Sequence, residues 1–277
     1  MRIDRLLRQR LLVIGAVLLL MVLAVALAAD WITPVSPTRM SMRTRFTPPG
    51  SARHLLGSDA FGRDVLSRLV HGARVSLRIG AMVVVIAGFF GTVIGAAAGY
   101  FRKLDGPLMR AMDALMAFPA ILLAIAIAAA LGPSEVNVVI ALAAVYAPRT
   151  ARIVRAQVLV LRESEYVQAA RVAGAGDAFI LHRHILPNCT APLIVQLTFV
   201  FAYAVLAEAV LSFLGVGPPP PTPTWGNMIA DGRNFIREAP WITMMPGIAI
   251  SVTVLGLNLL GDGLRDALDP RMQVAPG

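Results

Sequence analysis

Residues 164–187 read SEYVQAARVAGAGDAFILHRHILP, a polar stretch that carries arginine and histidine between long apolar segments. Its first part, 164–173, can form a helix with acidic side chains at its positive N-terminal end. Gly174 then provides a C-terminal cap or a point of close approach. Asp177 can cap a second short helix, and Pro187 should end it. We therefore expect a short helical island that protrudes from an apolar framework.

The composition of the 277-residue chain indicates a membrane protein. Hydrophobic residues make up 57% and charged residues 15%, with a mean hydropathy of +0.71. A soluble domain carries about 25% charge, so most of this apolar surface needs lipid. The net charge of +9 comes from arginines and the single lysine, Lys103. The arginines flank apolar runs, which is typical of membrane topology signals and not of a surface that binds nucleic acid. Cys189 is the only cysteine, which excludes an intrachain disulfide.

Apolar runs predict six transmembrane helices and an all-α polytopic membrane protein. Roughly 20 apolar residues are needed to cross about 30 Å of hydrocarbon. Five charge-free runs meet that need: 11–29, 79–101, 114–134, 189–207 and 239–261. A sixth run, 136–148, spans if its helix continues past three arginines whose long stems reach toward lipid headgroups. These are Arg149, Arg152 and Arg155.

Charge places both termini in the cytoplasm. Four arginines precede the first span, namely Arg2, Arg5, Arg8 and Arg10. They favour a cytoplasmic N-terminus, and an even number of spans puts the C-terminus on the same side. The eight arginines of residues 30–78, on the external side, go against this rule. We keep the assignment because the first helix usually dominates, and we expect that helix to stay as an uncleaved anchor although residues 26–28 are typical of a signal-peptidase site.

Residues 58–78 are the main amphipathic stretch. One helical face is apolar, with Phe61, Val65, Leu66, Leu69 and Val70, and the other is polar, with Arg63, Asp64, Ser67, Arg68 and His71. Such a helix should lie on the outer membrane interface. Residues 217–226 hold five prolines and predict a stiff, non-helical external loop. The three tryptophans fall near predicted external boundaries, as in an aromatic belt: Trp31, Trp225 and Trp241.

No enzyme chemistry is evident in the sequence. Lys103 lacks the glycine-rich turn of a phosphate-binding loop, and no His-Glu-x-x-His or Gly-x-Ser-x-Gly motif occurs. The four histidines are scattered along the chain and make a poor metal site. We therefore expect no catalytic residue, no metal and no cofactor in this chain. Two short helices around a glycine would also fit a helix-turn-helix DNA reader, but a position between two membrane spans argues against it.

Ordered motifs along nearly the whole chain resemble the dipeptide/oligopeptide permease family of ATP-driven (ABC) importers, the OppC/DppC-like inner-membrane components. They are LGSD (56–59), GRDVLSR (62–68), GAR (72–74), AFP (117–119), the pair Ala169-Ala170 with Gly174, HILPN (184–188), LSFLG (211–215), PTP (221–223), WGNM (225–228) and NLLGDGLRD (258–266). The resemblance implies an importer-type permease fold in three parts. These would be an anchor helix (1–30), an external segment with the interfacial helix (31–78) and a five-helix permease core (79–277).

The resemblance also implies that the island belongs to a cytoplasmic coupling loop, residues 156–190. On this basis the residues expected to contact an ATPase are Tyr166, Gln168, Ala169, Ala170, Arg171 and Gly174. The family usually has Glu where Gln168 stands, so a charge-assisted contact would become a neutral hydrogen bond of roughly half the strength. The implied partners are a second homologous permease, two ABC subunits that bind ATP and Mg²⁺, and an external substrate-binding protein, in the bacterial inner membrane. Peptides are the expected substrate, with nickel chelates, glutathione or another small solute as alternatives.

Glu208 is the candidate residue for the translocation path. An unpaired carboxylate inside a span costs about 3 kcal/mol or more. Glu208 could face the passage and meet a peptide amine, pair with a partner chain, or lie near the wet outer surface. Two other classes remain open: an ATP-independent secondary transporter, which should show inverted repeats and several intramembrane charges, and a membrane-tethered regulator whose residues 156–190 bind a signalling partner.

Overall fold

The computed structural model describes residues 10–52 and 54–268, and that part of the chain folds into helices and loops without a strand. Five helical segments are long and apolar enough to cross a membrane. They are built on α2 (Arg10–Leu27), α4 (Val65–Tyr100), α7 (Glu135–Leu161), α10 (Thr190–Phe213) and α12 (Trp241–Leu268). The predicted all-α polytopic fold is confirmed. Arg2, Arg5 and Arg8 lie outside the described residues, and the cytoplasmic location of the termini stays a prediction.

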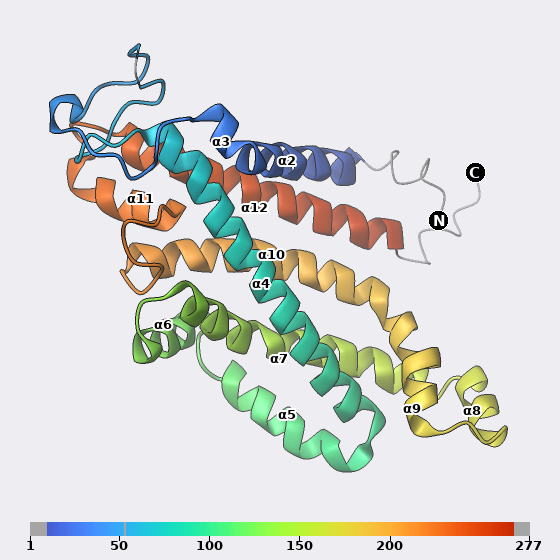
Figure 1. Ribbon diagram of the computed structural model, residues 1–277. Coiled ribbons are helices and arrows are strands. Elements are labelled where there is room, and N and C mark those ends of the chain that lie inside the picture. The colour runs from blue at the N-terminus through green and yellow to red at the C-terminus, as the bar shows by residue number, and fades with distance from the viewer. Residues whose placement is uncertain (1–9, 53, 269–277) are drawn as a thin grey trace.

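The spans form a layer that one long helix crosses. Helices α2, α12, α10 and α7 lie side by side in that order, and α4 runs obliquely across them (Figure 1). Its most extensive contact is with α7. The loops around residues 33–64 and α11 (Trp225–Gly232) gather at one end of the molecule (Figure 1). The island, with α8 (Glu165–Val172) and α9 (Asp177–Ile180), lies at the other end.

Glycines allow α4 and α7 to approach each other closely. Gly91, Gly95 and Gly99 recur every fourth residue, so they share one face of α4. A Cβ atom on Gly95 would lie 2.4 Å from the carbonyl oxygen of Ala151, and one on Gly99 would lie 2.7 Å from Cβ of Val158. Because lipid is as apolar as leucine, membrane helices associate through such close packing of small residues.

The third predicted span, 114–134, is wrong as a single helix. The structure has α5 (Arg102–Met116) and α6 (Ala120–Leu131), which meet at 90°. Pro119 lies at this break and has no amide hydrogen to continue α5, and the residue before a proline is disfavoured in helical conformation. Residues 102–131 therefore form a broken span or a re-entrant pair, which gives five membrane helices or six.

Helix α7 continues past Pro148 and the three arginines, as the sequence predicts. Two of the three arginines also form ion pairs within the chain. Arg152 pairs with Asp113 at 2.6 Å, and Arg155 holds Asp105 through two bonds of 2.5 and 2.6 Å. Both carboxylates belong to α5, so these ion pairs fasten α5 to α7.

The amphipathic stretch is not a separate interfacial helix. Residues 58–64 are not helical, and α4 begins at Val65 and runs to Tyr100 without a break. Asp64 caps it, with Oδ2 accepting from the backbone N–H of Ser67 at 2.7 Å. The polar side chains expected to face solvent are instead buried: Arg63, Asp64, Ser67 and Arg68. The division of the chain into three parts stays a prediction.

Tryptophan placement also differs from an aromatic belt. Trp225, the first residue of α11, is buried, and its Nε1–H donates to the carbonyl of Leu69 in α4 at 3.1 Å. Trp31 alone is almost fully exposed. The proline-rich loop is non-helical up to Thr224, as expected, and Asn227 ties it down by donating to the carbonyl of Pro218 at 2.9 Å.

We expect Gly95→Leu to destabilise the chain because α4 and α7 would be forced apart where they pack most tightly. Overpacking of this kind costs about 1–3 kcal/mol, and contact with backbone leaves little room to adjust. The free energy of unfolding, measured by denaturing-detergent titration of the purified chain, should fall by that amount. Gly247→Leu in α12 is the matched control, because no atom lies within 4 Å of a Cβ atom there. Equal loss in both variants would contradict the packing argument.

Candidate coupling loop and external ion cluster

The island carries the predicted helix and its predicted cap. Helix α8 starts after Ser164 and ends at Val172. Gly174 has φ +87°, its N–H donates to the carbonyl of Arg171 at 3.0 Å, and the next N–H, of Ala175, donates to Ala170 at 3.0 Å. This pair of bonds is the Schellman motif, which satisfies the last carbonyls of a helix and favours glycine at the left-handed position. The cap therefore fixes where the chain leaves α8.

The island is packed firmly onto the ends of two spans. Val167, Ile180 and Ile185 are buried together with residues of α4 and α7. The hydroxyl of Tyr100, the last residue of α4, donates to Asp177 Oδ1 at 2.7 Å. Arg162, which follows α7, donates to the carbonyl of Gly99 at 2.7 Å. Movement of the island is therefore tied to movement of α4 and α7.

Two predictions about the second helix are wrong. Gly176, not Asp177, occupies the cap of α9, because the Asp177 carboxylate is engaged by Tyr100. Pro187 does not end the helical path either. The backbone passes through a π-helical segment, η2 (Leu181–Ile185), and a 3₁₀ turn, η3 (Leu186–Cys189), directly into α10. A proline removes one backbone donor, and such irregular turns absorb that loss without a stop.

The six residues predicted to contact an ATPase fall into two groups. Tyr166, Ala169, Arg171 and Gly174 are exposed. Gln168 and Ala170 are half-buried and turn inward: Gln168 Nε2 donates to the carbonyl of Arg162 at 3.2 Å, and Ala170 packs on the cluster beneath α8. Arg171 Nη2 lies 3.5 Å from the Tyr100 hydroxyl, and this hydrogen bond raises the pKa of Arg171.

Two further residues of the island were not predicted as contacts. Val172 is 90% exposed at the end of α8, and Phe179 is 56% exposed on α9. Exposed apolar side chains beside polar ones are typical of a surface that another protein covers. Neither stands out in the sequence, because Val172 is followed by small residues and Phe179 lies in the apolar run 178–181.

Glu208 is closed inside the chain. It is completely buried in α10, and Ser212 Oγ donates to its Oε1 at 2.7 Å. Its Oε2 has no hydrogen-bond partner among the residues that the structure describes. Helix α11 lies tightly over this turn, because a Cβ atom on Gly226 would lie 2.2 Å from the carbonyl of Ala209. Helix α11 therefore covers this turn of α10 in the structure.

A cavity of 620 Å³ opens beside α10, toward the end of the molecule that carries the island. Its polar lining comes from α7, the turn before α10, α10 itself and α12: Gln157, Asn188, Gln196 and Arg265. Apolar residues such as Phe199 complete it. Asn188 and Arg265 lie in two of the motifs quoted above, whereas Gln157 and Gln196 were not singled out, since isolated amides in apolar helices carry no motif.

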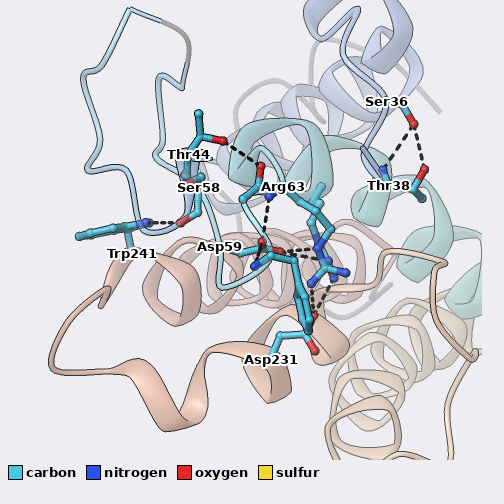
Figure 2. Close-up of polar contacts among 11 residues, drawn as sticks. Ser36, Thr38, Thr44, Ser58, Asp59, Arg63, Asp231 and Trp241 are labelled. Carbon is cyan, nitrogen blue, oxygen red and sulfur yellow. Dashed lines mark hydrogen bonds and ion pairs between the residues drawn. The ribbon is translucent and has the colours of Figure 1, made fainter. Parts of the chain in front are cut away.

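At the opposite end, a buried ion cluster joins α4 to α11 (Figure 2). Asp59 Oδ2 accepts from Arg63 Nε at 2.5 Å and from Arg68 Nη1 at 3.3 Å. Asp231 Oδ2 accepts from Arg63 at 2.7 Å and from Arg68 at 3.0 Å. The two arginine side chains and that of Asp59 are at most 6% exposed, whereas that of Asp231 is 33% exposed. The cluster thus fixes the loop before α4 against a helix more than 160 residues later in the chain.

Four of the eight arginines that oppose the positive-inside rule have ion-pair partners in the chain. Besides Arg63 and Arg68, Arg74 pairs with Asp30 at 2.8 Å and donates to the carbonyl of Ala26, and Arg78 pairs with Glu135 at 2.6 Å. The hydrogen bond from Arg74 lowers the pKa of Asp30. That contact therefore contributes to stability above the usual titration range of an aspartate, and the contribution is lost as the pH falls through the lowered value.

Among residues 10–52 and 54–268, no group of three or more His, Cys, Asp or Glu side chains is arranged to hold a metal ion. The polar chemistry of this part of the chain consists of the capped island, the amide-lined cavity and the ion cluster. These features, on an apolar helical framework, define a polytopic membrane protein with a polar cavity between helices.

Comparison with known proteins identifies the family. A family model described as binding-protein-dependent transport system inner membrane component matches residues 90–274, and one described as N-terminal TM domain of oligopeptide transport permease C matches residues 2–49. The first covers more than half of the chain. The chain belongs to the family of binding-protein-dependent ABC transport permeases, in its peptide and dipeptide branch. The resemblance drawn from the sequence motifs is confirmed.

Individual relatives are similar along almost their whole length. A protein of Brucella suis biovar 1 (strain 1330), assigned as a peptide transport system permease, is 59% identical over 270 residues, which cover 98% of this chain and 91% of the relative. The di/tripeptide transport system permease protein DppC of Pseudomonas aeruginosa (strain UCBPP-PA14) is 48% identical, with 94% and 88% covered. The dipeptide transport system permease protein DppC of Escherichia coli (strain K12) is 47% identical, with 94% and 89% covered.

We expect Asp59→Asn to cost more stability than Asp231→Asn, although each removes one carboxylate from the same two arginines. Asp59 is the deeper partner, and leaving buried arginines without it costs about 3–5 kcal/mol. Because the Asp231 side chain is more exposed, water can solvate the arginine atoms that lose their partner there. Asp231→Asn should therefore lower the stability less. The midpoint of thermal unfolding in detergent measures both. Glu238→Gln, at an exposed position near α12, controls for the change in net charge, and equal losses for the two aspartates would contradict this ranking.

Proposed function

We propose that this chain is the membrane-spanning permease subunit of an ATP-driven importer and forms half of the translocation path for peptides. It would work with a second homologous permease, two ABC subunits and an external substrate-binding protein in the bacterial inner membrane. The names of the relatives support peptides as the substrate class. Nickel chelates, glutathione or another small solute are the alternatives within the same family.

The single observation that carries the coupling role is the island, a capped helix held rigidly on the ends of α4 and α7. A partner that displaces α8 would move both spans, because buried side chains and two hydrogen bonds connect them. The surface offered to the ATPase is formed by Tyr166, Ala169 and Gly174, with Arg171 at its edge, beside the α4–α5 turn. Gln168 and Ala170 support that surface from beneath. ATP and Mg²⁺ are bound by the partner subunits, and this chain is not an enzyme.

The path through this subunit follows the amide-lined cavity along α10 toward Glu208. The amides of Gln157, Asn188 and Gln196 can exchange hydrogen bonds with a passing peptide, and Arg265 adds one positive charge that can attract a carboxylate. Glu208 is shut off in this conformation and would meet the substrate only when α11 moves away from α10. A buried carboxylate with one unpartnered oxygen is costly, which supports a functional rather than a purely structural reason for its presence.

Copurification separates this proposal from the other classes. The tagged chain, expressed with its neighbouring genes, should bring down two ATP-binding subunits and a second permease. A secondary transporter would bring down none, and a tethered regulator would bring down a signalling protein but support no uptake. Competition between labelled dipeptide and unlabelled glutathione or nickel chelate, during uptake into cells, identifies the substrate class. Failure of every peptide tested to compete would contradict the peptide assignment.

We expect Gly174→Trp to abolish uptake and Gly174→Ala to reduce it only in part. Nothing in the chain lies within 4 Å of a Cβ atom at Gly174, so within the subunit both variants carry the same strain of a positive φ, about 1–2 kcal/mol. A loss of uptake that appears with Trp but not with Ala, together with loss of the ATP-binding subunits, would then indicate a partner that packs against the island. Peptide uptake and recovery of the ATP-binding subunits with the purified permease are the measurements.

Gly132→Trp is the matched control for this series. Gly132 also has a positive φ, of +89°, and also has no atom within 4 Å of a Cβ atom, but it follows α6 rather than lying in the island. We expect it to keep its ATP-binding subunits. Normal uptake by the Gly174→Trp variant would show that no partner packs closely at this point.

A further inference from the structure

The turn between α4 and α5 forms a basic cavity against the island. The cavity has a volume of 440 Å³. It is lined by Tyr100, Phe101, Arg102, Lys103, Leu104, Arg171 and Asp177. Three of these side chains are cationic, and they come from two separate segments: Arg102 and Lys103 from the start of α5, and Arg171 from α8.

The positive charge of this cavity is not neutralised within the part of the chain that the structure describes. No carboxylate there lies within ion-pair distance of Arg102, Lys103 or Arg171. Asp177 is the single acidic residue of the lining, and its Oδ1 accepts from Tyr100. The next carboxylate along α5, Asp105, is held by Arg155. Three cations facing one carboxylate give the cavity an excess of positive charge.

The cavity also lies at the boundary between an apolar and a polar surface. It begins where α4, a membrane-spanning helix, ends at Tyr100. Two apolar side chains beside the cations are exposed, Phe101 at 40% and Leu104 at 44%. Basic side chains next to exposed apolar ones at the end of a span are the pattern that binds anionic lipid headgroups. A small soluble anion would use the cations but leave Phe101 and Leu104 uncovered.

We propose that this cavity binds the phosphate headgroup of an anionic phospholipid, with Arg102, Lys103 and Arg171 around the phosphate and the acyl chains along Phe101 and Leu104. One bound lipid would then connect the α4–α5 turn to the island, beside the existing contact between Tyr100 and Asp177. Transport activity would consequently depend on anionic lipid. The dependence of transport on anionic lipid rests on the proposed importer function, whereas the lipid site does not.

Native mass spectrometry of the purified full chain tests the site directly. The chain is mixed in detergent with phosphatidylglycerol or with phosphatidylcholine of the same acyl chains, and the bound lipids are counted. We expect a clear preference for phosphatidylglycerol. Each basic side chain near an anionic headgroup contributes about fivefold in affinity, or about 1 kcal/mol. The double variant Arg102→Gln/Lys103→Gln should therefore bind phosphatidylglycerol about 25-fold more weakly.

Arg110→Gln is the matched control, because Arg110 is an exposed arginine of the same helix that does not line the cavity. It should bind lipid as the unaltered chain does. Equal binding of the two lipids by the unaltered chain would overturn the proposal without any variant being made. Unchanged preference in the double variant would overturn it as well. Release of phosphatidylglycerol by an equal concentration of inorganic phosphate would show a small-anion site in place of a lipid site.

The ATP-binding subunits provide an independent readout. If they fail to copurify while the lipid preference remains, the proposed importer function fails and the lipid site stands. If they copurify and the lipid preference is absent, the lipid site fails and the proposed importer function stands. In proteoliposomes of the assembled importer, uptake should rise with the phosphatidylglycerol fraction, and this rise should be smaller for the double variant than for Arg110→Gln.

Discussion

The close packing of α4 on α7 is the constraint on which the rest of the structure depends. Without a hydrophobic drive between helices in lipid, the contact at Gly91, Gly95 and Gly99 relies on atoms meeting at van der Waals distance. Helix α4 has 36 residues, a length of about 54 Å, which exceeds the hydrocarbon thickness by a wide margin. It therefore reaches the ion cluster at one end and the island at the other, and its packing on α7 keeps these two sites in a fixed relation.

Helices and caps that depend on neighbouring residues were predictable from the sequence, whereas ion pairs between residues far apart in the chain were not. Runs of apolar residues located the spans, and the spacing from Ser164 to Gly174 located a capped helix, because both signals lie within a few turns. Arg63 and Arg68 also bind Asp231, more than 160 residues away, and no local pattern predicts that pairing. The same holds for Arg155, whose carboxylate partner lies in α5. The break at Pro119 was visible as a proline, but its 90° angle was not.

The inward turn of Gln168 gives a physical meaning to its departure from the usual glutamate. Its amide donates to the carbonyl of Arg162, which follows the last residue of α7. A glutamate side chain has no donor when ionised and would place negative charge beside that carbonyl. In this chain the residue therefore connects α8 to the end of α7 as a neutral donor. The Gln168 amide is thus used inside the chain, whereas its neighbours Tyr166, Ala169 and Arg171 are exposed.

Both ends of α4 are held by buried or half-buried polar contacts. A buried ion pair contributes little net stability because desolvation offsets its attraction, but removing one partner is costly. Asp59 binds Arg63 and Arg68 from the buried side, whereas Asp231 binds the same two arginines with a side chain that is 33% exposed. Of the contacts that join the loop before α4 to α11, those of Asp231 are therefore the ones that water can replace most readily. Helix α11 also packs on α10 at the turn that holds Glu208, so the cluster stabilises the helix that covers this carboxylate.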